Sequence, residues 1–265
     1  MMHLVFTDVD GTLLDHDTYR YDAALEGISI LHEKGIPLIL VSSKTLPEMS
    51  ILHHELALST PYIFENGGGI VWSGENDFVE RSGRDVSELK ERLPLLVEAL
   101  GEDVELVTDM DIDRIVQSTG LSPERARLVR QRRFSLPFIL PSGRKIGGAE
   151  LEDLNRHLQP AGYTVTKGGR FFHFLSIDAD KGGAVKKVIE YYRKKCGDAV
   201  KMIGIGDSEN DLPMLEAVDL PVVVKRREGS HIRTGLPNVY ETKEVGPSGF
   251  TEAIKFIFKG NHPAI

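Results

Sequence analysis

Acidic residues gather at two points of the 265-residue sequence, far apart along the chain. Asp8 and Asp10 stand two positions apart after a short apolar run, and Asp207 and Asp211 follow a second apolar run. Such carboxylates repel one another and would repel a phosphate, but they suit Mg²⁺, which binds carboxylate, phosphate and water oxygens. One carboxylate can then attack phosphorus, and another can protonate the leaving oxygen and later activate water. The pattern predicts magnesium-dependent phosphoryl chemistry.

Two further stretches carry groups that suit a phosphate. Ser42, after an apolar run, offers a hydroxyl and a backbone N–H to phosphoryl oxygens. Lys181 opens a predicted helix, where a cation opposes the helix macrodipole. This placement is explained if the ammonium group faces the phosphate and the aspartates. The plainer alternative for Lys181 is a surface lysine.

Turn and helix capping is the plainer alternative for the aspartates. Asp8 and Asp10 could cap a turn, and Asp207 and Asp211 could cap the helix that follows them. One residue of the second pair can serve as cap and site residue at once. The sequence leaves open which of the two touches a metal directly.

The elements around these stretches are those of an α/β protein with a doubly wound parallel sheet. Five nearly continuous apolar runs are typical of strands buried on both faces: 4–6, 36–41, 62–64, 200–205 and 221–224. Amphipathic periodicity predicts helices between them: 23–33, 181–195, 212–217 and 250–258. Ligands bind at the carboxyl ends of strands in such sheets. Three of the four polar stretches follow a strand there, so we expect them to form one site.

The middle of the chain has a different pattern and a different charge. Mixed helices and strands are predicted there: helices at 86–100, from 122 and at 150–158, a strand at 133–140, and a hairpin of 163–166 and 171–177. Residues 84–176 carry 14 Lys and Arg against 14 Asp and Glu, whereas the flanks carry 18 against 26 and thus the full net charge of −8. We predict a catalytic core of residues 1–83 and 177–265 with an inserted α+β cap at 84–176. The acidic core needs a cation to receive an anionic substrate.

In chain order, Asp-x-Asp-Gly-Thr, a strand-end Ser, a Lys and Gly-Asp-x-x-x-Asp resemble the four motifs of the haloacid dehalogenase superfamily. The resemblance implies a Rossmann-like core, and the place of the insertion resembles the C2 cap subclass, type B. It implies that Asp8 is the nucleophile and Asp10 the acid and base. It also implies that Mg²⁺ is held by both together with Asp207, and Asp211 is a further predicted ligand.

Shorter strings are similar to the mannosyl-3-phosphoglycerate phosphatase family of that superfamily: Ser42-Ser43-Lys44-Thr45, Glu65-Asn66-Gly67-Gly68, Arg132-Arg133-Phe134-Ser135, Gly169-Arg170-Phe171 with His173, and Gly206 to Asp211. The resemblance implies a small phosphorylated sugar acid as substrate and mannosylglycerate as product. An arginine would bind its carboxylate in bidentate fashion. The predicted substrate-binding residues are Ser43, Lys44, Asn66, Arg132, Arg170 and Asn210.

Plainer alternatives exist for most of these positions. Asn66 could stabilise a glycine turn, Arg130, Arg132 and Arg133 could form a solvated face, and Arg170 could be a hairpin-turn residue. His173, in an apolar strand, reads as a core residue. Three other functions also remain open, namely a phosphosugar mutase resembling phosphomannomutase, a phosphatase of another sugar phosphate, and a phosphosugar sensor without catalysis.

The amino-acid composition limits the classes of protein to which this chain can belong. With 41% hydrophobic and 27% charged residues the chain reads as a globular protein. The net charge of −8 argues against nucleic acid as a partner, and no apolar run is long enough for a membrane span. A lone cysteine, Cys196, excludes an internal disulfide and a cysteine-based zinc site. We therefore expect a cytoplasmic protein without a signal peptide, and the oligomeric state stays open.

Overall fold

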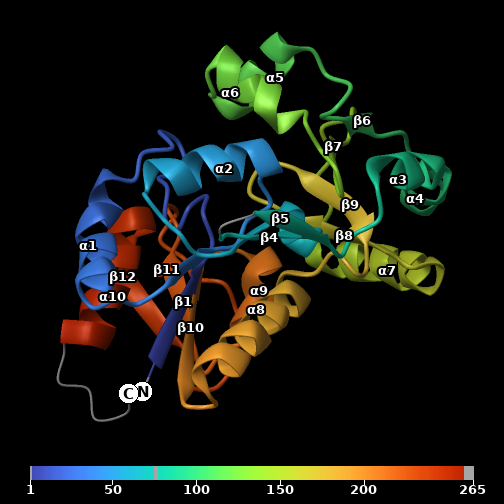
Figure 1. Ribbon diagram of the computed structural model, residues 1–265. Helices are drawn as coiled ribbons and strands as arrows, with labels where there is room; N and C mark the ends of the chain where they lie inside the picture. Colours follow the sequence, from blue (N-terminus) through green and yellow to red (C-terminus); the bar gives the residue numbers. More distant parts are fainter. Residues whose placement is uncertain (1, 75–76, 260–265) are drawn as a thin grey trace.

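The structure is a computed structural model that describes residues 2–74 and 77–259. Its centre is a five-stranded sheet in which every strand runs parallel to its neighbours (Figure 1). From edge to edge the strands are β12 (Tyr240–Val245), β11 (Leu220–Lys225), β10 (Val200–Gly206), β1 (Met2–Thr7) and β2 (Leu38–Leu40). The two ends of the chain meet at the centre, because β1 pairs with β10. The α/β class with a parallel sheet is confirmed, although β12 was not predicted.

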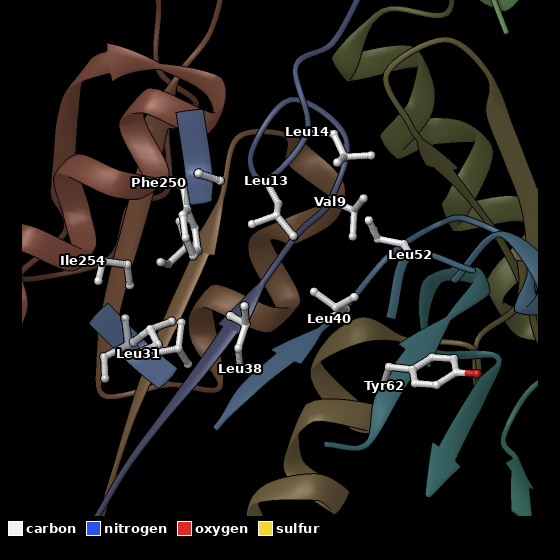
Figure 2. Packing of buried hydrophobic residues seen from close by; sticks show 14 of the residues in the cluster. Val9, Leu13, Leu14, Leu31, Leu38, Leu40, Leu52, Tyr62, Phe250 and Ile254 are labelled. Carbon is white, nitrogen blue, oxygen red and sulfur yellow. The ribbon is translucent and has the colours of Figure 1, made fainter. Parts of the chain in front are cut away.

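Helices cover both faces of this sheet, which explains the continuous apolar strands. One face packs against α1 (Leu25–Glu33) and α10 (Gly246–Lys259), and the other against α8 (Lys181–Cys196) and α9 (Leu212–Glu216). Alternate residues of β1 join opposite cores, with Val5 in the first and Leu4 and Phe6 in the second. Figure 2 shows the first core, where Leu31 and Phe250 approach Leu38.

A smaller antiparallel sheet extends the main one. It consists of β3 (Tyr62–Phe64), β4 (Gly69–Trp72) and β5 (Phe78–Arg81). The strand predicted at 62–64 is present, but it pairs with β4 in antiparallel fashion and is joined to the main sheet by a parallel bridge between Val41 and Ile63. The unpredicted helix α2 (Leu46–Glu55) begins at a capping box of Thr45 and Glu48.

The third sheet lies entirely within residues 105–176. Its antiparallel strands are, in order, β6 (Glu105–Leu106), β7 (Leu136–Ile139), β9 (Phe172–Ser176) and β8 (Tyr163–Lys167). Helices α4 (Leu93–Leu100) and α7 (Gly148–Leu158) share one hydrophobic core with it. The predicted hairpin is present as β8 and β9. This separate core is consistent with an inserted cap.

The remaining elements are short. The helix predicted at 86–100 is instead two helices, α3 and α4, because the chain turns at Arg92 ahead of Pro94. The helices and single turns not yet given bounds are α3 (Val86–Glu91), α5 (Ile112–Thr119), α6 (Pro123–Val129), η1 (Asp22–Ala24), η2 (Glu65–Gly67), η3 (Gln159–Ala161) and η4 (Glu209–Asp211). No helix within the described residues has both the length and the apolar character needed to cross a membrane.

Candidate active site

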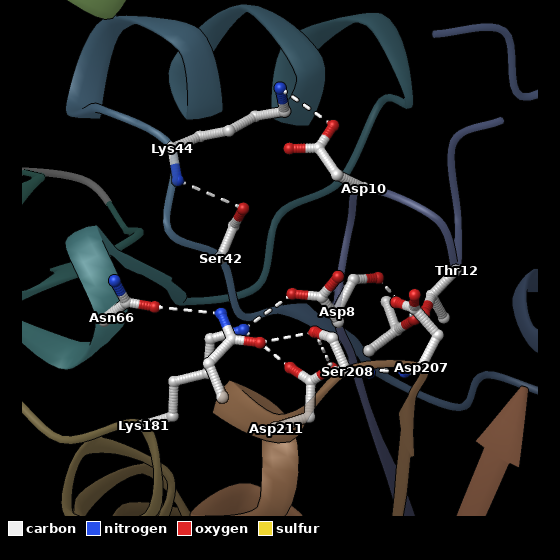
Figure 3. Close-up of polar contacts among 12 residues, drawn as sticks. Asp8, Asp10, Thr12, Ser42, Lys44, Asn66, Lys181, Asp207, Ser208 and Asp211 are labelled. Carbon is white, nitrogen blue, oxygen red and sulfur yellow. Dashed lines mark hydrogen bonds and ion pairs between the residues drawn. The ribbon is translucent and has the colours of Figure 1, made fainter. Parts of the chain in front are cut away.

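The four polar stretches meet at the carboxyl edge of the parallel sheet (Figure 3). Asp8 follows β1 directly, Asp207 follows β10 directly, and Lys181 is the first residue of α8. The Nζ atom of Lys181 lies 2.6 Å from Oδ1 of Asp8 and 2.6 Å from Oδ1 of Asp211. The convergence expected from the sequence is therefore present.

Three buried carboxylates form an acidic cluster here. Asp8, Asp207 and Asp211 offer oxygen atoms that all lie within 4.8 Å of one another. Burial, followed by the charge of Asp211, raises the pKa of Asp8 well above its usual value and that of Asp207 to about 7. One lysine faces these three carboxylates. Hard oxygen donors with excess negative charge fit a divalent cation of the kind that Mg²⁺ represents.

Lys181 is the buried cation of the cluster. Burial alone would lower its pKa, but Asp211 and Asp8 outweigh this effect and raise it. Because the ammonium group stays charged, it stabilises the ionised forms of both carboxylates. This arrangement explains a lysine at a helix start better than a surface position does, since its side chain is only 1% exposed.

Asp207 and Asp211 have distinct partners. Oδ2 of Asp211 accepts the N–H groups of Asp207 and Ser208 at 3.1 and 3.0 Å, while its Oδ1 faces Lys181. Asp211 thus closes the capping box of η4 with Ser208, whereas its side chain makes no capping hydrogen bond at α9, so the predicted cap of that helix is not formed. Oδ1 of Asp207 accepts the Thr12 hydroxyl at 3.0 Å.

Glycine makes this close packing possible at the turn after β1. Gly11 has a φ of +87°, and a Cβ atom there would lie 2.7 Å from Oδ2 of Asp207. The glycine of the first motif is therefore a steric requirement of the acidic cluster.

Asp10 takes a different direction from Asp8. Its Oδ1 lies 2.9 Å from Nζ of Lys44, which also approaches Oε1 of Glu48 at 3.7 Å. Burial lowers the pKa of Lys44, but Asp10 and Glu48 raise it above its usual value. Figure 3 shows the Asp10 carboxylate turned towards Lys44 and away from Asp211. The structure therefore does not bring the Asp10 carboxylate into the predicted metal-binding set, because this ion pair holds it elsewhere.

Ser42 has fewer groups available for a phosphate than the sequence suggested. Its backbone N–H donates to the carbonyl of Ile63 at 3.0 Å, where β3 approaches Val41. The expectation that this N–H serves a phosphate is wrong, because the link to β3 already uses it. The hydroxyl group accepts the N–H of Lys44 at 3.2 Å and can still donate its own hydrogen.

The remaining predicted residues surround one pocket beside Asp8 and Asp10. Ser43, Lys44, Arg132, Arg170 and Asn210 line it. Asn66 lies next to it, with its Oδ1 accepting Nδ2 of Asn210 at 3.3 Å and its buried Nδ2 without a partner within the described residues.

Both arginines of the predicted cap donate hydrogen bonds to backbone carbonyl groups of the core. Arg132 donates from Nη1 to the carbonyl of Ser43 at 2.6 Å. Arg170 donates from Nη2 to the carbonyl of His16 at 2.7 Å and from Nε to the Tyr19 hydroxyl at 3.1 Å. The guanidinium groups thus line the same pocket as Asp8, although residues 84–176 supply them.

Tyr19 was missed by the sequence reasoning. Nζ of Lys44 lies 5.2 Å and the guanidinium carbon of Arg170 5.6 Å from the centre of its ring. Its hydroxyl donates to the carbonyl of Thr119 at 2.9 Å. No local signal indicated this role, because every partner is remote in sequence.

Glu65 was also missed as a structural link, although its string carried part of the family resemblance. It is fully buried and has a left-handed φ of +48°. Its carboxylate accepts the N–H groups of Arg133 and Phe134, each at 2.9 Å, and the Ser135 hydroxyl at 2.7 Å. It therefore joins the loop that carries Asn66 to the chain entering β7.

At the carboxyl edge of the parallel sheet, Asp8 lies next to Lys181 and shares a pocket with Arg132 and Arg170 from the segment 84–176. This arrangement of charges suits a hydrolase that transfers a phosphoryl group. The model of the haloacid dehalogenase-like hydrolase family matches residues 5–108 and 146–229, and the chain belongs to this family. It is a phosphatase, a phosphoric monoester hydrolase.

Relatives extend over the whole chain. Two proteins named glucosyl-3-phosphoglycerate/mannosyl-3-phosphoglycerate phosphatase are similar to it. That of Persephonella marina is 32% identical and covers 95% of both chains, and that of Methanococcoides burtonii is 35% identical and covers 99% of both. A solved haloacid dehalogenase subclass IIB sugar phosphatase, BT4131, has a similar fold, with a TM-score of 0.66 at 18% identity over 97% of this chain and 99% of its own.

Proposed function

We propose that this phosphatase hydrolyses a phosphorylated sugar acid, mannosyl-3-phosphoglycerate, to mannosylglycerate and phosphate. One observation carries the proposal: a single pocket holds Asp8 together with the guanidinium groups of Arg132 and Arg170. A substrate with a phosphate and a carboxylate matches this charge pattern. The names of the two relatives support the same substrate class.

Asp8 is the proposed nucleophile. Its carboxylate oxygen forms a bond to phosphorus as the bond from phosphorus to the substrate oxygen breaks. Lys181, 2.6 Å away, favours the ionised carboxylate and faces the transferred phosphoryl group. Ser42 donates its hydroxyl hydrogen to a phosphoryl oxygen.

Asp10 is the proposed acid and base. It gives its proton to the departing substrate oxygen, then takes a proton from the water that attacks the phospho-aspartate. That attack releases phosphate and restores Asp8. Its position outside the acidic cluster, one-third exposed on the pocket wall, suits proton transfer.

Asp8, Asp207 and Asp211 are the residues that would hold Mg²⁺. The cation would offset the repulsion between these carboxylates and the phosphate. The raised pKa values of Asp8 and Asp207 support this assignment, because burial and, after it, the negative charge of Asp211 cause them, and a bound cation would offset both effects.

Residues 84–176 are the proposed cap, which selects the substrate. Ser43, Lys44, Asn66 and Asn210 bind it from the core side, and Arg132 and Arg170 bind its carboxylate. Arg132 donates from Nη1 to Ser43 and also from Nε to the carbonyl of Val129 at 2.9 Å, and Arg170 donates to His16 and Tyr19. A guanidinium has five N–H groups, so each arginine has further N–H groups for a substrate. The cytoplasmic location expected from the sequence belongs to the same proposal.

Phosphate release over a substrate panel tests the proposal. Mannosyl- and glucosyl-3-phosphoglycerate should be hydrolysed faster than 3-phosphoglycerate, mannose 6-phosphate and p-nitrophenyl phosphate. Turnover of the monophosphates without a bisphosphate activator excludes a mutase. Faster hydrolysis of a sugar phosphate without a carboxylate would overturn the substrate assignment, and tight binding without turnover would indicate a sensor.

A further inference from the structure

The third sheet carries two polar side chains that the proposed mechanism does not use. His173 on β9 and Thr166 on β8 are directly opposite each other in the antiparallel register. Opposed residues in such a pair lie on the same face of the sheet. Their strand neighbours Val165 and Phe174 point the other way, into the core shared with α7. His173 lines the same pocket as Asp8 and Arg170.

Each of the two residues has a buried polar atom without a partner among the described residues, although Thr166 as a whole is only half-buried. His173 is 4% exposed, and neither its Nδ1 atom nor Oγ1 of Thr166 has a hydrogen-bond partner within residues 2–74 and 77–259. Buried polar groups in proteins are normally paired, so two adjacent exceptions need an explanation. Thr164, two residues away on the same face, shows the normal case, since its hydroxyl donates to Asn155 at 3.0 Å. A bound molecule that supplies the missing partners would explain the exceptions.

The surroundings of His173 define what such a molecule presents. Burial, followed by the charges of Arg132 and Lys181, lowers the pKa of its imidazole to about 3. The ring is therefore neutral at physiological pH, with one donor and one acceptor nitrogen. A neutral imidazole suits a hydroxyl group, whereas the cations beside it suit the phosphate and the carboxylate.

The hairpin turn sets the position of the ring. A Cβ atom at Gly168 would lie 2.8 Å from Nε2 of His173. The N–H of Gly168 donates to the carbonyl of Phe171 at 2.9 Å, which closes the turn between β8 and β9. The absent side chain at Gly168 thus leaves the space that the ring occupies.

We propose that His173 and Thr166 form a subsite for a hydroxyl group of the sugar portion of the substrate. A sugar hydroxyl both donates and accepts, so it can pair with the ring nitrogen and with the threonine hydroxyl together. The subsite rests on the proposed function for the presence of a sugar. It assigns sugar recognition to β8 and β9, apart from the arginines that face the carboxylate.

Paired substrates test the subsite. Mannosyl-3-phosphoglycerate and 3-phosphoglycerate share the phosphate and the carboxylate but differ in the sugar. His173→Phe keeps an aromatic ring without nitrogen atoms. It should lower kcat/KM for the glycosylated substrate by at least about 10-fold and that for 3-phosphoglycerate by less than about 3-fold, a contrast expected for a lost hydrogen bond to substrate.

Two threonine variants form a matched pair, which also serves if His173→Phe folds poorly. Thr166→Val should lower the ratio of the two kcat/KM values by about 3-fold or more. Thr164→Val removes a hydroxyl that already has a partner in Asn155, so it should leave the ratio unchanged. Equal losses on both substrates in His173→Phe, or equal ratios in the two threonine variants, would overturn the subsite.

The two proposals fail in different ways. A wild-type enzyme that releases no phosphate from mannosyl-3-phosphoglycerate would overturn the proposed function. A wild-type enzyme that prefers this substrate and keeps its preference in His173→Phe would overturn the subsite alone. Nitrogen-15 NMR gives a direct readout in Asp8→Asn, because mannosylglycerate should shift the His173 ring resonances and glycerate should not. Identical spectra with both molecules would also contradict the subsite.

Discussion

The two sides of the pocket are built differently. On the core side, the charged groups are joined to one another: Lys181 contacts Asp8 and Asp211, both at 2.6 Å, and Lys44 contacts Asp10. On the side of the third sheet, Arg132 and Arg170 rest on carbonyl groups, and two buried polar atoms have no partner in the described part of the chain. On the core side the charged groups are already paired with one another, although Nδ2 of Asn66 has no partner among the described residues. On the other side, His173 and Thr166 have polar atoms that remain to be paired.

This difference follows from the elements that carry the residues. The core carboxylates stand at the ends of buried parallel strands, where helices on both faces restrict the backbone. Arg170 stands in a hairpin turn, and Arg132 follows the short helix α6. Turns tolerate more change than strands do. We infer that the core side sets the reaction and the other side sets the substrate.

Removing divalent metal should have the largest effect. Asp8, Asp207 and Asp211 gather excess negative charge, so chelation should abolish phosphate release from every substrate and Mg²⁺ should restore it. Ca²⁺, which is larger and less strict in coordination, should inhibit. Full activity in excess chelator would show that the core side is complete without a metal.

Asp8→Asn should have the next largest effect, on every substrate alike. The change keeps the size of the side chain but removes the attacking charge, so kcat should fall by at least about 10³-fold. Asp103→Asn changes an exposed aspartate outside the pocket and serves as the control. A variant that folds and keeps a tenth of the wild-type activity would rule out Asp8 as the nucleophile.

Arg170→Ala should distinguish the contribution of the third-sheet side of the pocket from that of the core side. Losing one partner of a buried charged hydrogen bond costs about 2–5 kcal/mol, so kcat/KM for mannosyl-3-phosphoglycerate should fall by at least about 30-fold. Hydrolysis of p-nitrophenyl phosphate should change by less than about 3-fold, because it needs only the core side. Arg144→Ala, at an exposed arginine paired with Glu102, is the control. Equal losses on both substrates would place Arg170 at the phosphate or in the scaffold.

The smallest effect is expected on how the free energy of unfolding depends on pH. His173 has a pKa lowered from 6.5 to about 3 in the folded protein, so the folded state binds fewer protons than the unfolded state between these values. Stability should therefore fall as the pH falls through this window. Between pH 6.5 and 5.5 the imidazole alone should reduce the free energy of unfolding by about 1 kcal/mol.

Urea unfolding at both pH values measures this term. His173→Gln removes the titrating group and should reduce the pH-dependent loss by about 1 kcal/mol, whereas His54→Gln at an exposed position should not. An unchanged difference in His173→Gln would mean that the ring is already protonated in the folded state or open to water.

Much of the core side was predictable from the sequence. Asp8 and Asp207 directly follow apolar runs, and the carboxyl ends of parallel strands meet at one edge. The helix start at Lys181 was predictable for the same local reasons. The strand at 62–64 was predicted, but its antiparallel partner β4 was not, because a short apolar run does not reveal its pairing. The apolar pattern of residues 86–100 also did not reveal that the helix is interrupted at Arg92.

The sequence by itself determined which chemistry the chain can perform and at which edge of the sheet, because motif spacing and strand periodicity are local properties. Only the tertiary structure decided how the side chains pair. It directed Asp10 to Lys44, engaged the Ser42 N–H with Ile63, and brought Arg170 to Tyr19, 151 residues away. Such contacts depend on the packing of whole elements against one another, which no local pattern encodes. The same packing leaves His173 buried and neutral, with no partner for Nδ1 in the part of the chain that the structure describes.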